Sequence, residues 1–164
     1  MESIELDEAD LRLLSLLQDD ASLSNQRLAE LAHVSPPTSL RRIKRLHALG
    51  LIERQVALLQ PDRLAALTGH GLTALVEITL ERQGAEQVQA FEDRAVADPA
   101  VQQCYRVSPG PDFVLVVHSR DMPDHLTLAQ RLFTSDANVR NVKAFFSLRR
   151  AKFDPRLPLP PHIR

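Results

Sequence analysis

The stretch from Ser35 to Leu49 predicts a helix with a defined start and two unlike faces. Serine is a favoured N-cap residue, and Pro36 suits the first helical turn because a proline there loses no helical hydrogen bond. At about 100° per residue, one side of the helix is an apolar stripe and the basic residues fall largely opposite it. The stripe consists of Leu40, Ile43 and Leu46, and the basic residues are Arg41, Arg42, Lys44 and Arg45.

Two further helix starts precede this one. Asp7 is a predicted N-cap flanked by Leu6 and Leu11, and Ser24 is a second one flanked by Leu23 and Leu28. In both, the flanking leucines have the spacing of a hydrophobic staple. Three short helices, a tight turn at 33–35 and a final basic helix match a helix-turn-helix, whose last helix enters the major groove of DNA. The β-prone residues 51–59 that follow Gly50 predict a wing strand.

The distribution of charge agrees with this interpretation, although the whole chain has a net charge of −1. Residues 1–20 hold one basic and seven acidic residues, which gives −6. Residues 21–60 hold six basic and two acidic residues, which gives +4, and four of these bases lie between positions 41 and 45. We therefore expect the predicted third helix to be the DNA-facing element.

The composition, 44% hydrophobic, is that of a folded protein, and no apolar run approaches the roughly 20 residues of a membrane span. The acidic N-terminus does not resemble a signal peptide, so we expect a cytoplasmic protein that does not bind membranes. Cys104 is the single cysteine, and no cysteine and histidine cluster has metal-ligand spacing. We expect neither a metal site nor a cofactor.

Beyond residue 71 the pattern alternates between strand and helix. Apolar alternation predicts strands at 72–80, 101–108, 112–119 and 142–152, and helical periodicity predicts helices at 85–97 and 123–135. The last strand alternates Val142, Ala144, Phe146 and Leu148. The order β-α-β-β-α-β predicts a ferredoxin-like sandwich, and hence an α+β protein overall. The expected domains are 1–60 for DNA binding, a linker at 61–71 with His70 exposed between two glycines, 72–152 for the sandwich, and a tail at 153–164.

Residues 6–64 closely resemble the Lrp/AsnC family of transcription regulators. The shared features are Leu-Asp-x-x-Asp at 6–10, the Ser-Pro helix start at 35–36 and Gly-Leu-Ile at 50–52. The resemblance implies a regulator that binds double-stranded DNA and controls genes of amino-acid metabolism. It makes residues 25–44 the helix-turn-helix proper. Together with the basic face, the predicted DNA-binding residues are Asn25, Ser35, Pro36, Thr38, Ser39, Arg41, Arg42, Lys44 and Arg45.

The resemblance extends through the second half, which in this family, as the RAM domain, binds an amino-acid effector and forms homo-oligomers, from dimers to octamers. The family's effector loop corresponds to residues 107–113, where Pro109 and Pro111 flank Gly110 and remove two backbone donors. The other interpretation is a rigid hairpin turn, with Phe146 a core residue. The effector-binding residues implied by the family are Ser108, Gly110, Asp112, Met122 and Phe146.

Two other functions compete with DNA-dependent regulation. Siroheme decarboxylases, which resemble this architecture, place histidines between the second and third strands, whereas no histidine lies between Val101 and Phe113 here. We therefore expect no enzyme activity and no catalytic residue. A DNA-free metabolite sensor would leave the arginine cluster without a role. The final eleven residues contain four prolines, so we expect this tail to pack across a partner subunit or to fray.

Overall fold

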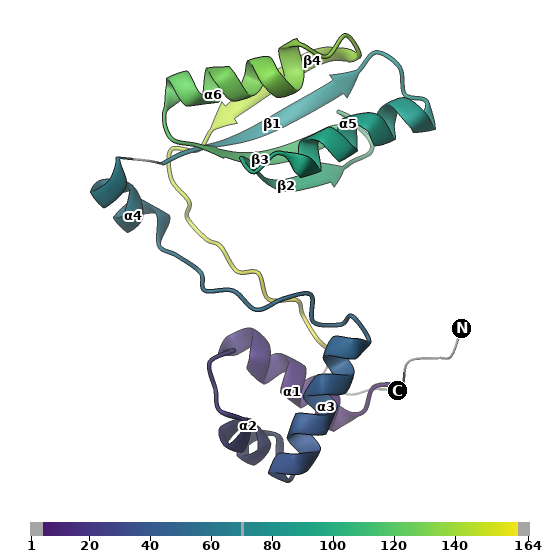
Figure 1. Cartoon of the computed structure of the whole chain (residues 1–164), viewed down its shortest axis with the longest axis vertical. Coiled ribbons are helices and arrows are strands. Elements are labelled where there is room, and N and C mark those ends of the chain that lie inside the picture. The colour runs from purple at the N-terminus through teal and green to yellow at the C-terminus, as the bar shows by residue number, and fades with distance from the viewer. Residues whose placement is uncertain (1–4, 70, 161–164) are drawn as a thin grey trace. The chain divides into compact units, whose positions relative to one another are not determined.

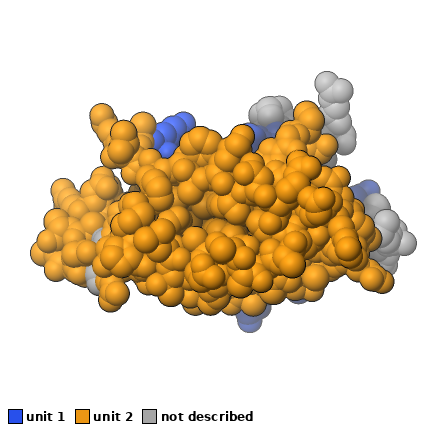
Figure 2. All heavy atoms as spheres, turned by 90° about the horizontal axis from the view of Figure 1, so that it is seen from above, with its two compact units in different colours: residues 1–58, 152–164 blue, residues 59–151 orange. Residues whose placement is uncertain are grey.

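The computed structural model describes residues 5–69 and 71–160 and divides the chain into two compact units. Unit 1 comprises residues 1–58 and 152–164, and unit 2 comprises residues 59–151 (Figure 2). The chain therefore passes between the units twice, once after Leu58 and once after Ala151. His70, which we predicted to be an exposed linker residue, lies outside the described residues.

Unit 1 contains the three predicted helices, α1 (Glu8–Asp19), α2 (Asn25–Ala32) and α3 (Pro36–Ala48). All three predicted N-caps are confirmed, because the side chains of Asp7, Ser24 and Ser35 each accept a hydrogen bond from a backbone N–H in the first turn. Asp7 also forms a capping box with Asp10. At the other end of α3, Gly50 adopts φ 70°, as expected of the residue after a helix C-cap.

The packed face of α3 differs from the predicted stripe. Leu46 is fully buried with Leu13, Leu28 and Ala32, and Ile43 packs against this cluster as expected. Leu40, however, is 46% exposed. Ser39 is fully buried instead, so the helix is rotated from the predicted orientation and its inner face runs through positions 39, 43 and 46.

The predicted wing is not formed. Residues 52–60 adopt neither helix nor strand, and the segment ends at a short helix, α4 (Pro61–Thr68), that we had not predicted within the linker. A β-strand requires a neighbouring backbone to satisfy its N–H and C=O groups, and the single chain supplies none here. β-propensity alone was therefore insufficient.

Unit 2 confirms the predicted βαββαβ order (Figure 1). Its four strands form one antiparallel sheet with the order β2-β3-β1-β4. The second helical segment ends in a π-helical turn, η1 (Gln130–Thr134). The other elements are β1 (Leu72–Leu80), α5 (Ala85–Ala97), β2 (Val101–Arg106), β3 (Phe113–Ser119), α6 (Met122–Ala129) and β4 (Val139–Phe146).

Both helices of the sandwich cover the same face of the sheet. Every second residue of β1 and β3 is buried, and these residues share one core with Val88, Phe91, Leu128 and Phe133 of the helical segments. The opposite face is not covered by these helices, and its Leu75 and Phe145, which are paired in the β1–β4 register, are 44% and 54% exposed. Leu148, predicted as part of the last strand, lies beyond β4 and is 99% exposed.

Within the described ranges 5–69 and 71–160, no helix is long and apolar enough to cross a membrane. The same residues contain no group of three or more histidine, cysteine, aspartate or glutamate side chains arranged to hold a metal ion.

The buried His125 makes the stability of unit 2 dependent on pH. Burial lowers the pKa of His125 below its usual 6.5. Below that pH the unfolded chain binds a proton that the native state resists, so stability is complete above about pH 6.5 and falls as the pH decreases through the window below it. NMR titration should show His125 titrating below pH 6.5, and His125→Gln should flatten urea unfolding midpoints between about pH 7.5 and 5.5. The exposed His47→Gln is the control, and an unchanged pH profile in His125→Gln would contradict the assignment.

Candidate nucleic-acid interface and effector loop

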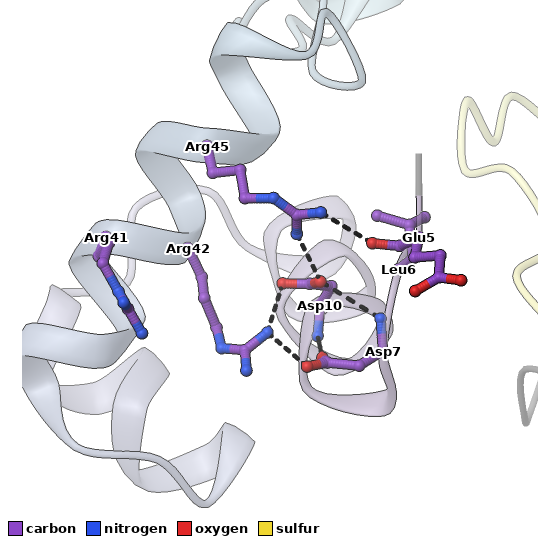
Figure 3. A pocket seen from close by; sticks show the side chains of 7 residues that line it. All are labelled: Glu5, Leu6, Asp7, Asp10, Arg41, Arg42 and Arg45. Atoms are coloured by element: carbon purple, nitrogen blue, oxygen red, sulfur yellow. Dashed lines mark hydrogen bonds and ion pairs between the residues drawn. The ribbon is translucent and has the colours of Figure 1, made fainter. Parts of the chain in front are cut away.

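The four basic residues of α3 divide into two pairs with different environments. Arg42 and Arg45 point toward α1, whereas no interaction is drawn to Arg41 (Figure 3). Among the described residues, none forms an ion pair or a side-chain hydrogen bond with Arg41 or Lys44, and both side chains are exposed. Two of the four cations of α3 are thus paired with acids of the same unit, and the other two have no ion-pair partner among the described residues.

The internal pair surrounds Asp10, which is only 1% exposed. Arg42 Nη1 donates to Asp10 Oδ1 at 2.9 Å, and Arg45 Nη1 donates to Asp10 Oδ2 at 3.0 Å. Arg42 also contacts Asp7 Oδ2 at 2.7 Å, and Arg45 Nη2 donates to the Glu5 carbonyl at 2.7 Å. We call Asp7, Asp10, Arg42 and Arg45 the Asp–Arg clamp; it lines a pocket of about 480 Å³.

The clamp changes the titration of its members. The hydrogen bond to Asp10 raises the pKa of Arg42, against the opposing effect of burial. Burial acts to raise the pKa of Asp7, but the Asp10 backbone N–H and the Arg42 guanidinium outweigh it, so the pKa of Asp7 is lowered. The pair of Asp7 and Arg42 therefore remains charged at neutral pH, and the clamp as a whole joins α3 to α1.

Sequence analysis missed the clamp, although a signal was present. Asp7, the N-cap of α1, and Asp10 in its first turn are three residues apart in the sequence. Arg42 and Arg45 of α3 are also three residues apart. Residues three apart lie on one face of a helix, so matching charge pairs on two packed helices are able to meet. We had instead assigned Asp7 to the N-cap of the first helix and both arginines to DNA.

Three other predicted DNA-binding residues are buried or hydrogen-bonded within unit 1. Ser39 is fully buried, so its side chain belongs to the helix interface and not to the DNA-facing surface. Asn25 Nδ2 donates to the Pro36 carbonyl at 2.9 Å and ties α2 to the first turn of α3. Thr38 is half-buried, and its hydroxyl lies 2.8 Å from that of Ser35.

The first turn of α3 offers few backbone donors to a phosphate. Pro36 and Pro37 have no N–H, the Thr38 N–H donates to Ser35 Oγ, and the Ser39 N–H donates to the Ser35 carbonyl. The N-terminus of a helix commonly binds anions through such groups. Here any such contact would have to come from side chains, and the predicted residues that remain exposed are Ser35, Pro36, Arg41, Lys44 and Arg45, of which Arg45 is also paired with Asp10.

The predicted effector residues fall into two groups that one chain does not bring together. Ser108, Gly110 and Asp112 lie in the loop before β3, beside the end of β1, since the Asp112 N–H donates to the Ile78 carbonyl at 2.8 Å. Phe146 pairs with Ala74 near the start of β1. Four residues of strand, roughly 13 Å, separate these positions along β1. Met122 follows the far end of β3.

Asp112 is held by the sheet but keeps a free acceptor. Its Oδ2 accepts the Leu80 N–H at 2.7 Å, which caps the end of β1. No described residue donates to its Oδ1. Ser108 and Gly110 are exposed, and Gly110 has φ 125°, a conformation that favours glycine. The loop therefore fits both earlier interpretations, a rigid turn and a site with an available carboxylate.

Phe146 and Met122 are partly exposed at the other end of the sheet. The Phe146 ring is 38% exposed and meets the His125 ring edge-on, with centroids 4.9 Å apart. Met122 is the first residue of α6 and is 44% exposed. Neither residue is a fully buried core side chain.

The clamp and the exposed cations should respond differently to substitution. Asp10→Asn removes the buried charge that Arg42 and Arg45 share and leaves Arg42 only its contact with Asp7, so we expect unit 1 to lose roughly 3 kcal/mol. Arg41→Gln, its matched control on the exposed face of α3, should change stability by less than about 0.5 kcal/mol. Urea unfolding combined with hydrogen–deuterium exchange of α1 and α3 measures both. Equal exchange in the two variants would show that the clamp does not hold α3.

Comparison with known proteins agrees with both units. Residues 6–47 match the AsnC-type helix-turn-helix domain, and residues 73–157 match the Lrp/AsnC ligand binding domain. The Escherichia coli "DNA-binding transcriptional activator DecR" is 32% identical over 154 residues, covering 94% of this chain and 99% of that protein. The "Leucine-responsive regulatory protein" of Rhizobium meliloti is 31% identical over 149 residues, covering 91% and 93%.

Solved structures give the same result. The regulator NMB0573 of Neisseria meningitidis, solved as an L-Met complex, has a TM-score of 0.82 at 27% identity and covers 94% of this chain and 97% of that one. An AsnC family regulator of Agrobacterium tumefaciens also has a TM-score of 0.82 at 27% identity, with 93% and 97% covered. Because the two family matches span the helix-turn-helix and the sandwich, the chain belongs to the Lrp/AsnC family of DNA-binding transcription regulators.

Proposed function

We propose that this regulator is a cytoplasmic homo-oligomer that places α3 in the major groove and controls amino-acid metabolism genes in response to a small effector. The observation that carries the DNA-binding part is the division of the α3 cations. Arg42 and Arg45 are bound by Asp10, while Arg41 and Lys44, on the adjacent part of the same helix surface, are exposed and have no ion-pair partner among the described residues. A rigid helix with free cations on its outer face suits contact with DNA.

The exposed residues suggest how the contact is divided. Arg41 and Lys44 are suited to phosphate oxygens or to guanine, both of which are acceptors. Leu40, exposed beside them, is suited to a thymine methyl group. Ser35 and Pro36, at the start of α3, would lie nearest the DNA backbone. The other predicted residues act indirectly by fixing the position of α3, and these are Asn25, Ser39, Arg42 and Arg45.

An amino acid is the effector that the loop at 107–113 supports best. The similar Neisseria meningitidis regulator was solved with L-Met. In this chain, the free Oδ1 of Asp112 is able to accept a hydrogen bond from an ammonium group. The two prolines of the loop leave fewer N–H groups for a carboxylate. Because Met122 and Phe146 lie at the opposite end of β1, we assign them to the same site only if a second copy brings them there.

The uncovered sheet face is our candidate for assembly. Leu75 lies between Val116 of β3 and Phe145 of β4 in the register, so three apolar side chains form one row across the sheet. Below this row, Glu77 lies opposite Lys143. A face of this kind, with an apolar row that no helix covers, is suited to pairing with the same face of a second copy.

DNA binding is tested by fluorescence anisotropy with the upstream region of the gene. The affinity of the full chain should fall steeply with salt, with log K decreasing by about 0.9 per phosphate contact for each unit of log salt. Arg41→Gln and Lys44→Gln should each weaken binding and reduce this slope by about one, without unfolding the protein. Circular dichroism checks the fold. Salt-independent binding, or variants that bind like the wild type, would count against the proposed interface.

Assembly is tested by sedimentation of sheet-face variants. Leu75→Glu places a charge in the apolar row and should shift the protein from dimer toward monomer, because burying an unpaired carboxylate is costly. Val96→Glu on α5 is the matched control, since Val96 is exposed on a helix and away from this face. If Leu75→Glu sediments like the wild type, another surface forms the oligomer.

A further inference from the structure

The described part of the C-terminal tail packs within unit 1, whereas we had expected the tail to pack across a partner subunit or to fray. Residues 152–160 cluster with residues 1–58, although the 93 intervening residues, 59–151, form unit 2. Within the described part, the tail contacts α1 through Arg156 and Leu157. Nothing in its composition, apart from the prolines, predicts a docked segment.

The contacts between tail and helix are specific. Gln18 of α1 pairs with both backbone groups of Leu157, because its Oε1 accepts the Leu157 N–H at 2.7 Å and its Nε2 donates to the Leu157 carbonyl at 3.2 Å. A side-chain amide that pairs with both groups of one residue fixes the register of the tail. One residue earlier, Arg156 Nη1 contacts Asp19 Oδ1 at 2.7 Å.

Arg156 is also held in place within the tail. Its guanidinium binds both carboxylate oxygens of Asp154, at 3.0 and 2.9 Å, and the Arg156 N–H donates to Asp154 Oδ1 at 3.2 Å. These hydrogen bonds lower the pKa of Asp154 to about 2. The arginine is therefore oriented toward α1 by its own segment, and one guanidinium joins Asp154 to Asp19.

An apolar groove of about 1500 Å³ lies at this contact. Its walls are formed by α1, by residues 51–58, which form neither helix nor strand, and by the tail itself, all within unit 1. The prolines suit a docked strand, since they restrict the free tail and leave fewer N–H groups to be satisfied. Most of the lining is aliphatic and includes Leu14 and Leu17 of α1, Ile52, Val56 and Leu58 of the segment, and Leu157 of the tail.

We propose that α1 and residues 51–58 form a binding site for the proline-rich segment Asp154–Pro160, and that the docked segment is a latch on the DNA-binding unit. The latch attaches the helix-turn-helix non-covalently to the chain that leaves unit 2 after Ala151, in addition to the covalent linker after Leu58. Two connections restrict the orientations of α3 more than one does. This inference rests on the proposed function of an oligomer that places two α3 helices on DNA.

The consequence concerns DNA with two half-sites. When one α3 is bound, the second one binds at an effective concentration that depends on how freely its unit moves. The latch should raise that concentration by limiting the motion. It should not alter the contact between one α3 and one half-site, because the docking residues Gln18 and Asp19 lie at the C-terminal end of α1, whereas the acids that hold α3 lie at its start.

The docking step is tested in the full chain by amide exchange measured with NMR. The Leu157 N–H should be protected in the wild type and should lose about tenfold or more of that protection in Gln18→Ala. Alanine favours the helix, so α1 should remain folded, which thermal unfolding verifies. Ser15→Ala, an exposed position on the same helix, is the matched control and should retain the protection. An unprotected Leu157 N–H in the wild type would overturn the docking.

The latch function is tested by anisotropy with duplexes that contain one or two half-sites, mapped by footprinting the upstream region. Gln18→Ala, and a chain ending at Lys152, should bind one half-site like the wild type and two half-sites about tenfold more weakly. The latch would be overturned if the variants bound both duplexes with the same affinity as the wild type. It would also be overturned if the variants lost the same affinity on both duplexes, because that result would indicate destabilisation of the whole unit. Wild-type protein that binds neither duplex, with Leu157 still protected, would instead refute the proposed function and leave the docking intact.

Discussion

The buried carboxylate of Asp10 is the interaction on which the DNA-binding unit depends. An acid that is 1% exposed requires counter-charges, and both are supplied by α3, at 2.9 and 3.0 Å. Since an isolated buried charge is strongly unfavourable, any rotation of α3 that released Arg42 or Arg45 would be costly. The same constraint decides which cations of α3 remain unpaired, and so it determines the surface that we propose for DNA binding.

Local features of the fold were predictable from the sequence because they depend on neighbouring residues. Asp7, Ser24 and Ser35 cap their helices as predicted, since an N-cap requires only its own first turn. Apolar alternation likewise predicted β1, and helical periodicity predicted α5 and α6. The clamp was not predicted, because it joins residues more than 30 positions apart. Ser39 was misplaced for a related reason: hydropathy ranked Leu40 as the inner residue, but packing against the other helices selected Ser39.

Other differences between the sequence-based predictions and the structure occur where a single chain does not supply the partner groups that a segment requires. Residues 51–59 have β-propensity but no neighbouring strand, so the wing does not form. Leu75, Val116 and Phe145 form an apolar row without a covering helix, and the effector candidates occupy two ends of β1. These features share one physical basis, since each is a surface or segment whose partner groups are absent from the same unit. A sequence pattern specifies the strand or the apolar row, but not the chain that completes it.

The acidic N-terminus acquires a different meaning from the structure. Seven acids among the first 20 residues give this end of the sequence a net charge of −6. Three of them, Asp7, Asp10 and Asp19, bind arginines of the same unit, two on α3 and one in the tail. The charge of these three acids is thereby largely compensated within unit 1. The helix that they belong to, or cap, contacts both α3 and the C-terminal segment. Net charge per segment therefore misjudges this unit, because opposite charges separated in sequence neutralise one another in the fold.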